Sequence, residues 1–262
     1  PELLERQAAL WLHLAGARGI LEGQGSASAT DAAQRAFEIG AHIKGRSFYG
    51  AVAVQASMLC AHGRIDEADV IAQGLREQYR NSGDFDCGVA SDFASVVVAG
   101  LRGETDLQIE IGRHMMDTFP APETVTDPMH FFHPRVYTWM SLGEALRGNA
   151  DASRHYGTRA LQLASSRGDV FNVLGAKLTW VEASAILGEL QGTAAAAAAV
   201  ERDFAAAGGQ QWGAAARIVS VWAEAMEGGS VDPQDGFDAF ETLRSDGTCV
   251  MHAYFLALLS DI

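Results

Sequence analysis

The chain has 262 residues, of which 48% are hydrophobic, enough to bury a sizeable core in one long domain or two short ones. Its formal net charge of −14 repels a nucleic-acid backbone, and no apolar run approaches the roughly 20 residues that a membrane-spanning helix needs, so we expect neither direct nucleic-acid binding nor a membrane segment. The three cysteines lie far apart, and no basic segment followed by an apolar one opens the chain, which favours a reducing, cytoplasmic location.

Apolar residues recur three and four positions apart along most of the chain, which predicts amphipathic helices and no strand. The first predicted helix spans residues 2–22, and Thr30 or Asp31 is expected to cap the second. The first half then predicts helices over residues 48–62, 66–80, 87–101 and 106–119.

Residues 133–168 form the clearest pair of helices. Pro134 stands in the first turn, where proline is tolerated, and Gly148 ends the first helix. Asn149 or Asp151 is expected to cap the second. The remainder predicts helices over residues 170–190, 194–207, 211–227, 233–243 and 248–262, the last of them unfinished.

Glycines stand at the predicted turns about every 40 residues. They are Gly25, Gly63, Gly103, Gly148, Gly192 and Gly229. A period of this length is typical of stacked helical hairpins, in which each hairpin buries one face against the next. The sequence therefore predicts an all-α array with an extended concave surface.

Prolines interrupt the repeat at one place, residues 120–134, which contain Pro120, Pro122, Pro128 and Pro134. A long loop rich in proline often separates two packed units. We therefore expect N-terminal helical repeats over 1–119, a linker loop over 120–134 and C-terminal helical repeats over 135–262. The chain begins without methionine and ends within an apolar helical pattern, so we expect a fragment truncated at both ends.

Two resemblances follow from these segments. The spacing from Gly63 to Ala68 is similar to the hairpin turn of tetratricopeptide repeats, which implies hairpins stacked in a right-handed superhelix. Residues 133–136 (HPRV), 160–161 (AL) and 251–259 (MHAYFLALL) together resemble the C-terminal repeat region of bacterial signalling ATPases. That group includes LuxR-type and maltose-activator-like transcription regulators and predicted-ATPase adenylate/guanylate cyclases. The resemblance implies a non-catalytic sensor or protein-interaction arm of a multidomain regulator.

The residues that such regulators use for chemistry are not found. No G-x-x-x-x-G-K-[ST] phosphate loop and no G-x-S-x-G nucleophile elbow occur, so we expect no enzyme activity and no cofactor. His130, His133 and Asp127 could form a metal cluster, but their spacing favours loop packing and helix capping instead, and we expect no metal site.

Four tryptophans are candidates for a ligand pocket on the concave face: Trp139, Trp180, Trp212 and Trp222. Core packing is the commoner role of a large aromatic side chain on an apolar stripe. Of these, Trp139, Trp180 and Trp222 are the predicted contacts of a ligand or partner.

The cations nearest to the tryptophans in sequence are Arg135, Lys177 and Arg217. In so acidic a chain they could hold an anionic ligand or an acidic peptide, whereas a surface ion pair with a nearby carboxylate is the simpler role. We include all three among the predicted contacts.

Several functional readings stay open at this point. The partner could be a separate protein or other domains of the same parent chain, and a sugar or metabolite could bind in the concave groove. A stand-alone repeat adaptor is a third reading, and an all-α enzyme a fourth. Leu256 and Leu259 could also pair two copies of the chain into a homodimer.

Overall fold

The computed structural model describes residues 2–122, 127–245 and 247–262. Over these ranges the chain forms thirteen α-helices and no strand, which confirms the predicted all-α helical-repeat fold. The helices are α1 Glu2–Leu21, α2 Ala27–Ala41, α3 Arg46–Ala61, α4 Ile65–Ser82, α5 Phe85–Leu101, α6 Thr105–Thr118, α7 Phe132–Leu146, α8 Ala150–Ser166, α9 Val170–Ile186, α10 Thr193–Ala206, α11 Gln210–Met226, α12 Pro233–Arg244 and α13 His252–Ser260. None of them is long and apolar enough to cross a membrane.

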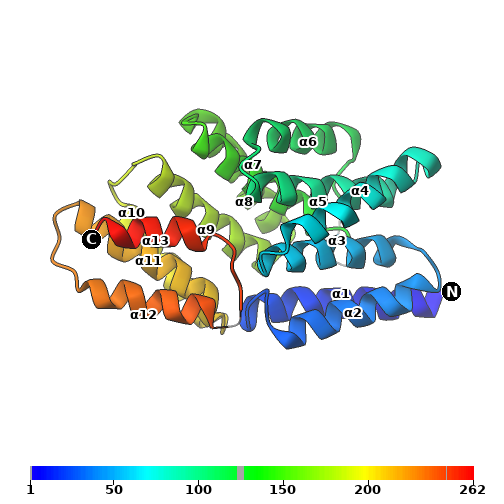
Figure 1. Ribbon diagram of the computed structural model, residues 1–262, viewed down its shortest axis with the longest axis horizontal. Coiled ribbons are helices and arrows are strands. Elements are labelled where there is room, and N and C mark those ends of the chain that lie inside the picture. Colours follow the sequence, from blue (N-terminus) through cyan, green and yellow to red (C-terminus); the bar gives the residue numbers. More distant parts are fainter. Residues whose placement is uncertain (1, 123–126, 246) are drawn as a thin grey trace.

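The helices form an inner and an outer layer. Figure 1 shows them following an arc, from α1 and α2 near one end of the molecule to α11, α12 and α13 near the other. The odd-numbered helices α1 to α11 pack on one another in succession, whereas each even-numbered helix packs on its odd-numbered neighbours. Consistent with this, twelve of the 17 residues of α5 are buried, against four of the 14 residues of α6.

The helix ends follow the predicted turn chemistry with a few differences. Ser26, and not Thr30 or Asp31, caps α2, because its hydroxyl accepts the free backbone N–H of Ala29 at 3.2 Å. The last helix begins at His252 and not near Thr248. These corrections are local and leave the order of the helices unchanged.

The turn glycines recur at a shorter and more regular interval than the sequence analysis predicts. Glycines in the left-handed conformation stand 20 residues apart at Gly148, Gly168, Gly188, Gly208 and Gly228. The turn after α11 therefore has Gly228 rather than Gly229 in the left-handed conformation, and the turn after α1 contains Gly23 as well as the predicted Gly25. Only glycine adopts this conformation without a steric cost, so these positions set the length of each helix-and-turn unit.

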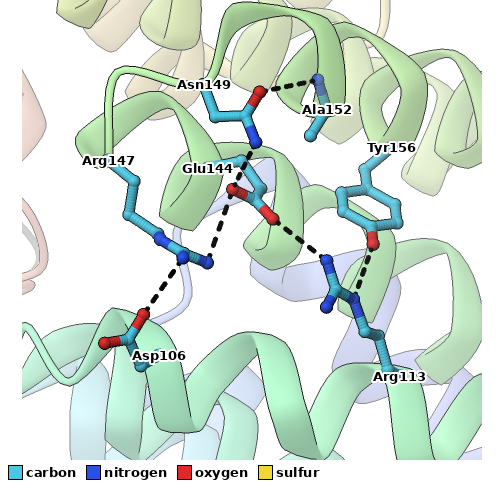
Figure 2. A network of polar contacts seen from close by, with 7 residues as sticks. All are labelled: Asp106, Arg113, Glu144, Arg147, Asn149, Ala152 and Tyr156. Atoms are coloured by element: carbon cyan, nitrogen blue, oxygen red, sulfur yellow. Dashed lines mark hydrogen bonds and ion pairs between the residues drawn. The ribbon is translucent and has the colours of Figure 1, made fainter.

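The predicted hairpin of α7 and α8 is joined through a buried carboxylate (Figure 2). Glu144 is 1% exposed and accepts a hydrogen bond from Asn149 at 3.3 Å. Arg113 of α6 and Arg147 approach the same carboxylate at 3.4 Å and 3.6 Å. Asn149 also caps α8 by accepting from the backbone N–H of Ala152. One side chain thus connects three helices.

The proline-rich loop does not interrupt the core. Residues 123–126 of the predicted linker lie outside the described ranges, and the last residues of that linker, from Phe132, belong to α7. Phe132 is fully buried, with its ring 4.5 Å from that of Phe93 in α5. A single apolar cluster runs from Tyr49 to Met140. The helices on the two sides of the loop therefore pack against each other directly.

The two ends of the arc meet. The indole N–H of Trp212 in α11 donates to the carbonyl oxygen of Gly19 in α1 at 3.1 Å. The segment between α12 and α13 crosses to α3, where the backbone N–H of Cys249 donates to the carbonyl of Ala61 at 2.6 Å. These contacts narrow the concave side of the array, where the predicted groove is present as a half-open apolar cavity.

Candidate functional site

The cavity on the concave side has two connected compartments. The wide compartment has a volume of about 380 Å³ and lies between α1, α3, α7 and α9. The narrow compartment has a volume of about 90 Å³ and continues between α7, α9 and the segment that precedes α13. Four residues line both, namely Gln24, Ser57, Arg135 and Phe171. A half-open, mostly apolar cavity of this kind is a usual form of a small-molecule site.

Arg135 is the only arginine among the residues that line either compartment, and it stands where they meet. Its guanidinium carbon lies 5.2 Å from the centre of the Phe171 ring. Among the described residues its guanidinium makes no hydrogen bond and no ion pair, unlike those of Arg113 and Arg147 in Figure 2. Burial lowers the pKa of Arg135 to about 10, partly offset by the charge of Asp169, so it remains a cation at neutral pH.

A histidine–aspartate pair lines the wide compartment beside Arg135. Nε2 of His130 lies 3.4 Å from Asp169, and its Nδ1 lies 2.7 Å from the carbonyl oxygen of Asp127. Burial would raise the pKa of Asp169, but hydrogen bonds from His130 and Asn172 outweigh it and hold that pKa below its usual value. Both nitrogens of His130 are therefore engaged, which argues against a role for it as a free acid or base.

His13 faces this pair from α1. Its ring lies 5.4 Å from that of His130, and its buried Nε2 has no hydrogen-bond partner in the described part of the chain. Burial and the neighbouring His130 lower the pKa of His13, so it is a neutral imidazole at pH 7. A neutral imidazole can accept from, or donate to, a polar group of a bound molecule.

One face of α9 forms the wall of the narrow compartment. Phe171, Gly175, Leu178 and Glu182 occupy successive turns along this face. Glu182 is 4% exposed, and its carboxyl group makes no hydrogen bond or ion pair with any described residue. Burial raises the pKa of Glu182 to about 8, so the group is mostly a neutral acid at pH 7.

Trp139 and Trp212 also line the narrow compartment, and both are anchored. Trp212 is held through its bond to Gly19. The carbonyl oxygen of Trp139 accepts from the side-chain amide of Gln108, which is buried between α5, α6 and α7. Gln108 fits there because residue 143 is glycine, since a Cβ atom at that position would lie 2.6 Å from its amide oxygen. The indole ring of Trp212 is therefore held in place, and Gln108 fixes the backbone of α7 at Trp139.

The structure brings two of the six predicted contact residues together, Arg135 and Trp139, in the narrow compartment. Lys177 and Trp180 lie instead in a surface groove of about 400 Å³ between α8, α9 and α10. Lys177 pairs there with Asp203 at 2.6 Å. The groove and the cavity are thus separate places on α9.

The other two predicted residues lie in neither place. Arg217 pairs with Asp235 at 2.7 Å, the surface role considered for it above. Trp222 packs in the C-terminal core, and its indole N–H donates to Asp261 at 3.3 Å. We therefore do not include them in the candidate site.

The two histidines of the proline-rich loop bind different carbonyl oxygens. His133 is buried and its Nε2 lies 2.8 Å from the carbonyl oxygen of Phe119, away from His130. Across the residues that the structure describes, no group of three or more histidine, cysteine or acidic side chains could hold a metal ion.

Sequence analysis missed Glu182, His13 and Phe171 as site residues. The available signal for Glu182 was a single acidic residue in a mostly apolar helix, Val170–Ile186, which also contains Lys177. An acidic side chain on a largely buried helix is a candidate functional group. Comparison of the chain with protein-family models, curated proteins and solved structures finds no match.

Proposed function

We propose that this chain is the ligand-sensing arm of a multidomain bacterial signalling or transcriptional regulator in the cytoplasm, and that its cavity binds a small amphipathic organic anion. The observation that carries the ligand class is Arg135, a largely buried cation whose guanidinium has no hydrogen bond or ion pair with the described residues, at the junction of two apolar compartments. The regulator rests on the resemblance of residues 133–136, 160–161 and 251–259 to signalling-ATPase repeat regions, and the location rests on the three scattered cysteines.

An anionic ligand would place a negative charge beside the Arg135 guanidinium in the cavity. A buried charge without a counter-ion destabilises the protein, and a carboxylate or phosphate at Arg135 would supply a charge-assisted hydrogen bond. The wide compartment has room for the apolar part of the molecule. Asp169 cannot take this role because its carboxylate is already engaged by His130 and Asn172.

The test is a titration of the purified chain with straight-chain fatty acids of increasing length and with the matched primary alcohols, followed by calorimetry and thermal unfolding. We expect the acids to bind and raise the unfolding temperature, and the alcohols to bind at least about tenfold more weakly. Arg135→Gln should abolish the preference for acids. The variant should remain folded, since it removes a charge that has no protein partner.

Arg202→Gln is the matched control, because Arg202 is exposed on the outer helix α10. It should bind fatty acids as the unmodified chain does. Equal affinity of acids for the Arg135→Gln variant and for the unmodified chain would refute the proposal.

Binding of a protein partner is a second candidate function, favoured by Trp180. This side chain is 38% exposed beside the surface groove and packs against Gly157 of α8. Trp180→Ala should weaken binding of the adjoining domain of the parent chain, supplied as a separate protein, by at least about tenfold. Fatty-acid affinity should not change, since Trp180 does not line the cavity. An unchanged affinity for the adjoining domain would exclude the groove as its binding site.

A further inference from the structure

The narrow compartment has an ionisable group at each end. The Arg135 guanidinium lies over the ring of Phe171, and Phe171 is in the first turn of α9. Glu182 is near the end of the same helix. Both residues line the compartment, and Phe171, Gly175 and Leu178 form the wall between them. A molecule lying along this wall would touch both groups.

The distance between the two groups sets the length of such a molecule. Phe171 and Glu182 are eleven residues apart on α9, which corresponds to roughly 16 Å along the helix axis. Both side chains lean toward the N-terminus of the helix, so the spacing between them stays close to this value. An extended chain of several methylene groups spans this distance.

The ionisable group at each end of the compartment lacks a hydrogen-bond or ion-pair partner among the described residues. The carboxyl group of Glu182 has no hydrogen-bond or ion-pair partner in the described ranges, and the same holds for the guanidinium of Arg135. The nearest titratable neighbour of Glu182 is Tyr254, but its hydroxyl donates to the Glu182 backbone carbonyl at 3.3 Å and not to the side chain. The side chains of Arg135 and Glu182 do not form an ion pair with each other, because they lie at opposite ends of the compartment.

The surroundings of Glu182 favour a cation over a neutral polar group. Trp139 lines the same compartment and packs in a cluster with Ala183, the residue after Glu182, and an indole face attracts a positive charge. An ammonium group placed there would keep Glu182 ionised and form a charge-assisted hydrogen bond with it. A neutral hydroxyl group would gain only an ordinary hydrogen bond.

We infer that the ligand is a zwitterion, an elongated molecule with its anionic group at Arg135 and a cationic amine at Glu182. This inference rests on the proposed function and deepens it, because it adds a second charged group to the proposed organic anion. A zwitterion brings one opposite charge to each end of the compartment. The wide compartment can accept an apolar branch of the same molecule.

The experiment compares three series of probes at pH 7 by calorimetric titration: straight-chain fatty acids, ω-hydroxy fatty acids and ω-amino fatty acids of equal lengths. We expect the ω-amino acids to bind best at one chain length, and there at least about tenfold tighter than the ω-hydroxy acids. Glu182→Gln should remove this preference and leave the affinity for plain fatty acids unchanged. Glu227→Gln, at an exposed position after α11, is the matched control and should retain the preference.

The possible outcomes separate this inference from the proposal on which it rests. Equal binding of ω-amino and ω-hydroxy acids would refute the zwitterion while fatty-acid binding still supports an anion site at Arg135. A Glu182→Gln variant that weakens all three series equally would also refute it. Failure of all three series to bind the unmodified chain would overturn the proposed function together with this inference.

Discussion

Replacing Phe132 with alanine is expected to lower the free energy of unfolding by about 3–5 kcal/mol, the usual cost of truncating a fully buried phenylalanine. Phe132 has no exposed surface, and its ring packs against Phe93 at 4.5 Å and Phe131 at 4.2 Å. The loss is large because this ring fills the space between α5 and α7, where a cavity would remain. Urea unfolding followed by circular dichroism measures the effect.

Phe237→Ala is the matched control for this prediction. Phe237 lies on α12 and is 43% exposed, so its truncation removes little buried surface and should cost less than about 1 kcal/mol. Similar losses for the two variants would contradict the packing of α7 on α5. Both variants should be compared at one pH, so that no titration contributes to the difference.

Replacing Glu182 with glutamine is expected to stabilise the protein in a manner that depends on pH. The pKa of Glu182 is about 8 in the folded protein, against 4.5 for the ordinary side chain. Between these values the unfolded chain releases this proton while the folded protein keeps it, so the original chain loses stability as pH rises from 4.5 toward 8. Glutamine has no proton to release. The variant should therefore match the original near pH 5 and exceed it by on the order of 3 kcal/mol near pH 8.

The measurement is denaturant unfolding of both chains at the two pH values, with Glu144→Gln as the comparison. Glu144 is as buried as Glu182, but Asn149 and two arginines contact its carboxylate (Figure 2). The same chemical change should therefore destabilise the protein there, by about 1–2 kcal/mol. A Glu182→Gln variant that gains nothing between pH 5 and pH 8 would mean that Glu182 ionises without cost in the folded protein.

The local part of this structure could be predicted from the sequence. Helical periodicity and turn glycines depend on residues a few positions apart, and they correctly predicted the succession of helices and turn positions such as Gly63 and Gly148. Errors were confined to helix ends. At the start of α2, for example, Ser26 caps the free backbone N–H groups because it precedes the residues predicted for that role. Arg135 and Trp139 were found because a cation and an aromatic residue stand close together on one helix.

The cavity itself could not be predicted, because distant residues form it. Trp212 reaches Gly19 across 193 residues, and no periodic pattern encodes that contact. Glu182 was overlooked for a related reason. Whether an acidic side chain points to solvent, to an arginine or into a cavity depends on how the helices pack in three dimensions. Glu144 and Glu182 both interrupt apolar helices, yet only the packed structure distinguishes their surroundings.

The contact between Trp212 and Gly19 has a consequence for the order in which the molecule folds. Most helices touch only their near neighbours, so folding can begin at any hairpin and spread along the chain. Joining α1 to α11 closes a loop of 193 residues, and its entropic cost is recovered only when both ends are already formed. The closure is therefore a late event in folding. A nascent chain that is still missing α9 to α11 would be a folded but open arc, unable to retain a ligand until synthesis has passed the last of these helices.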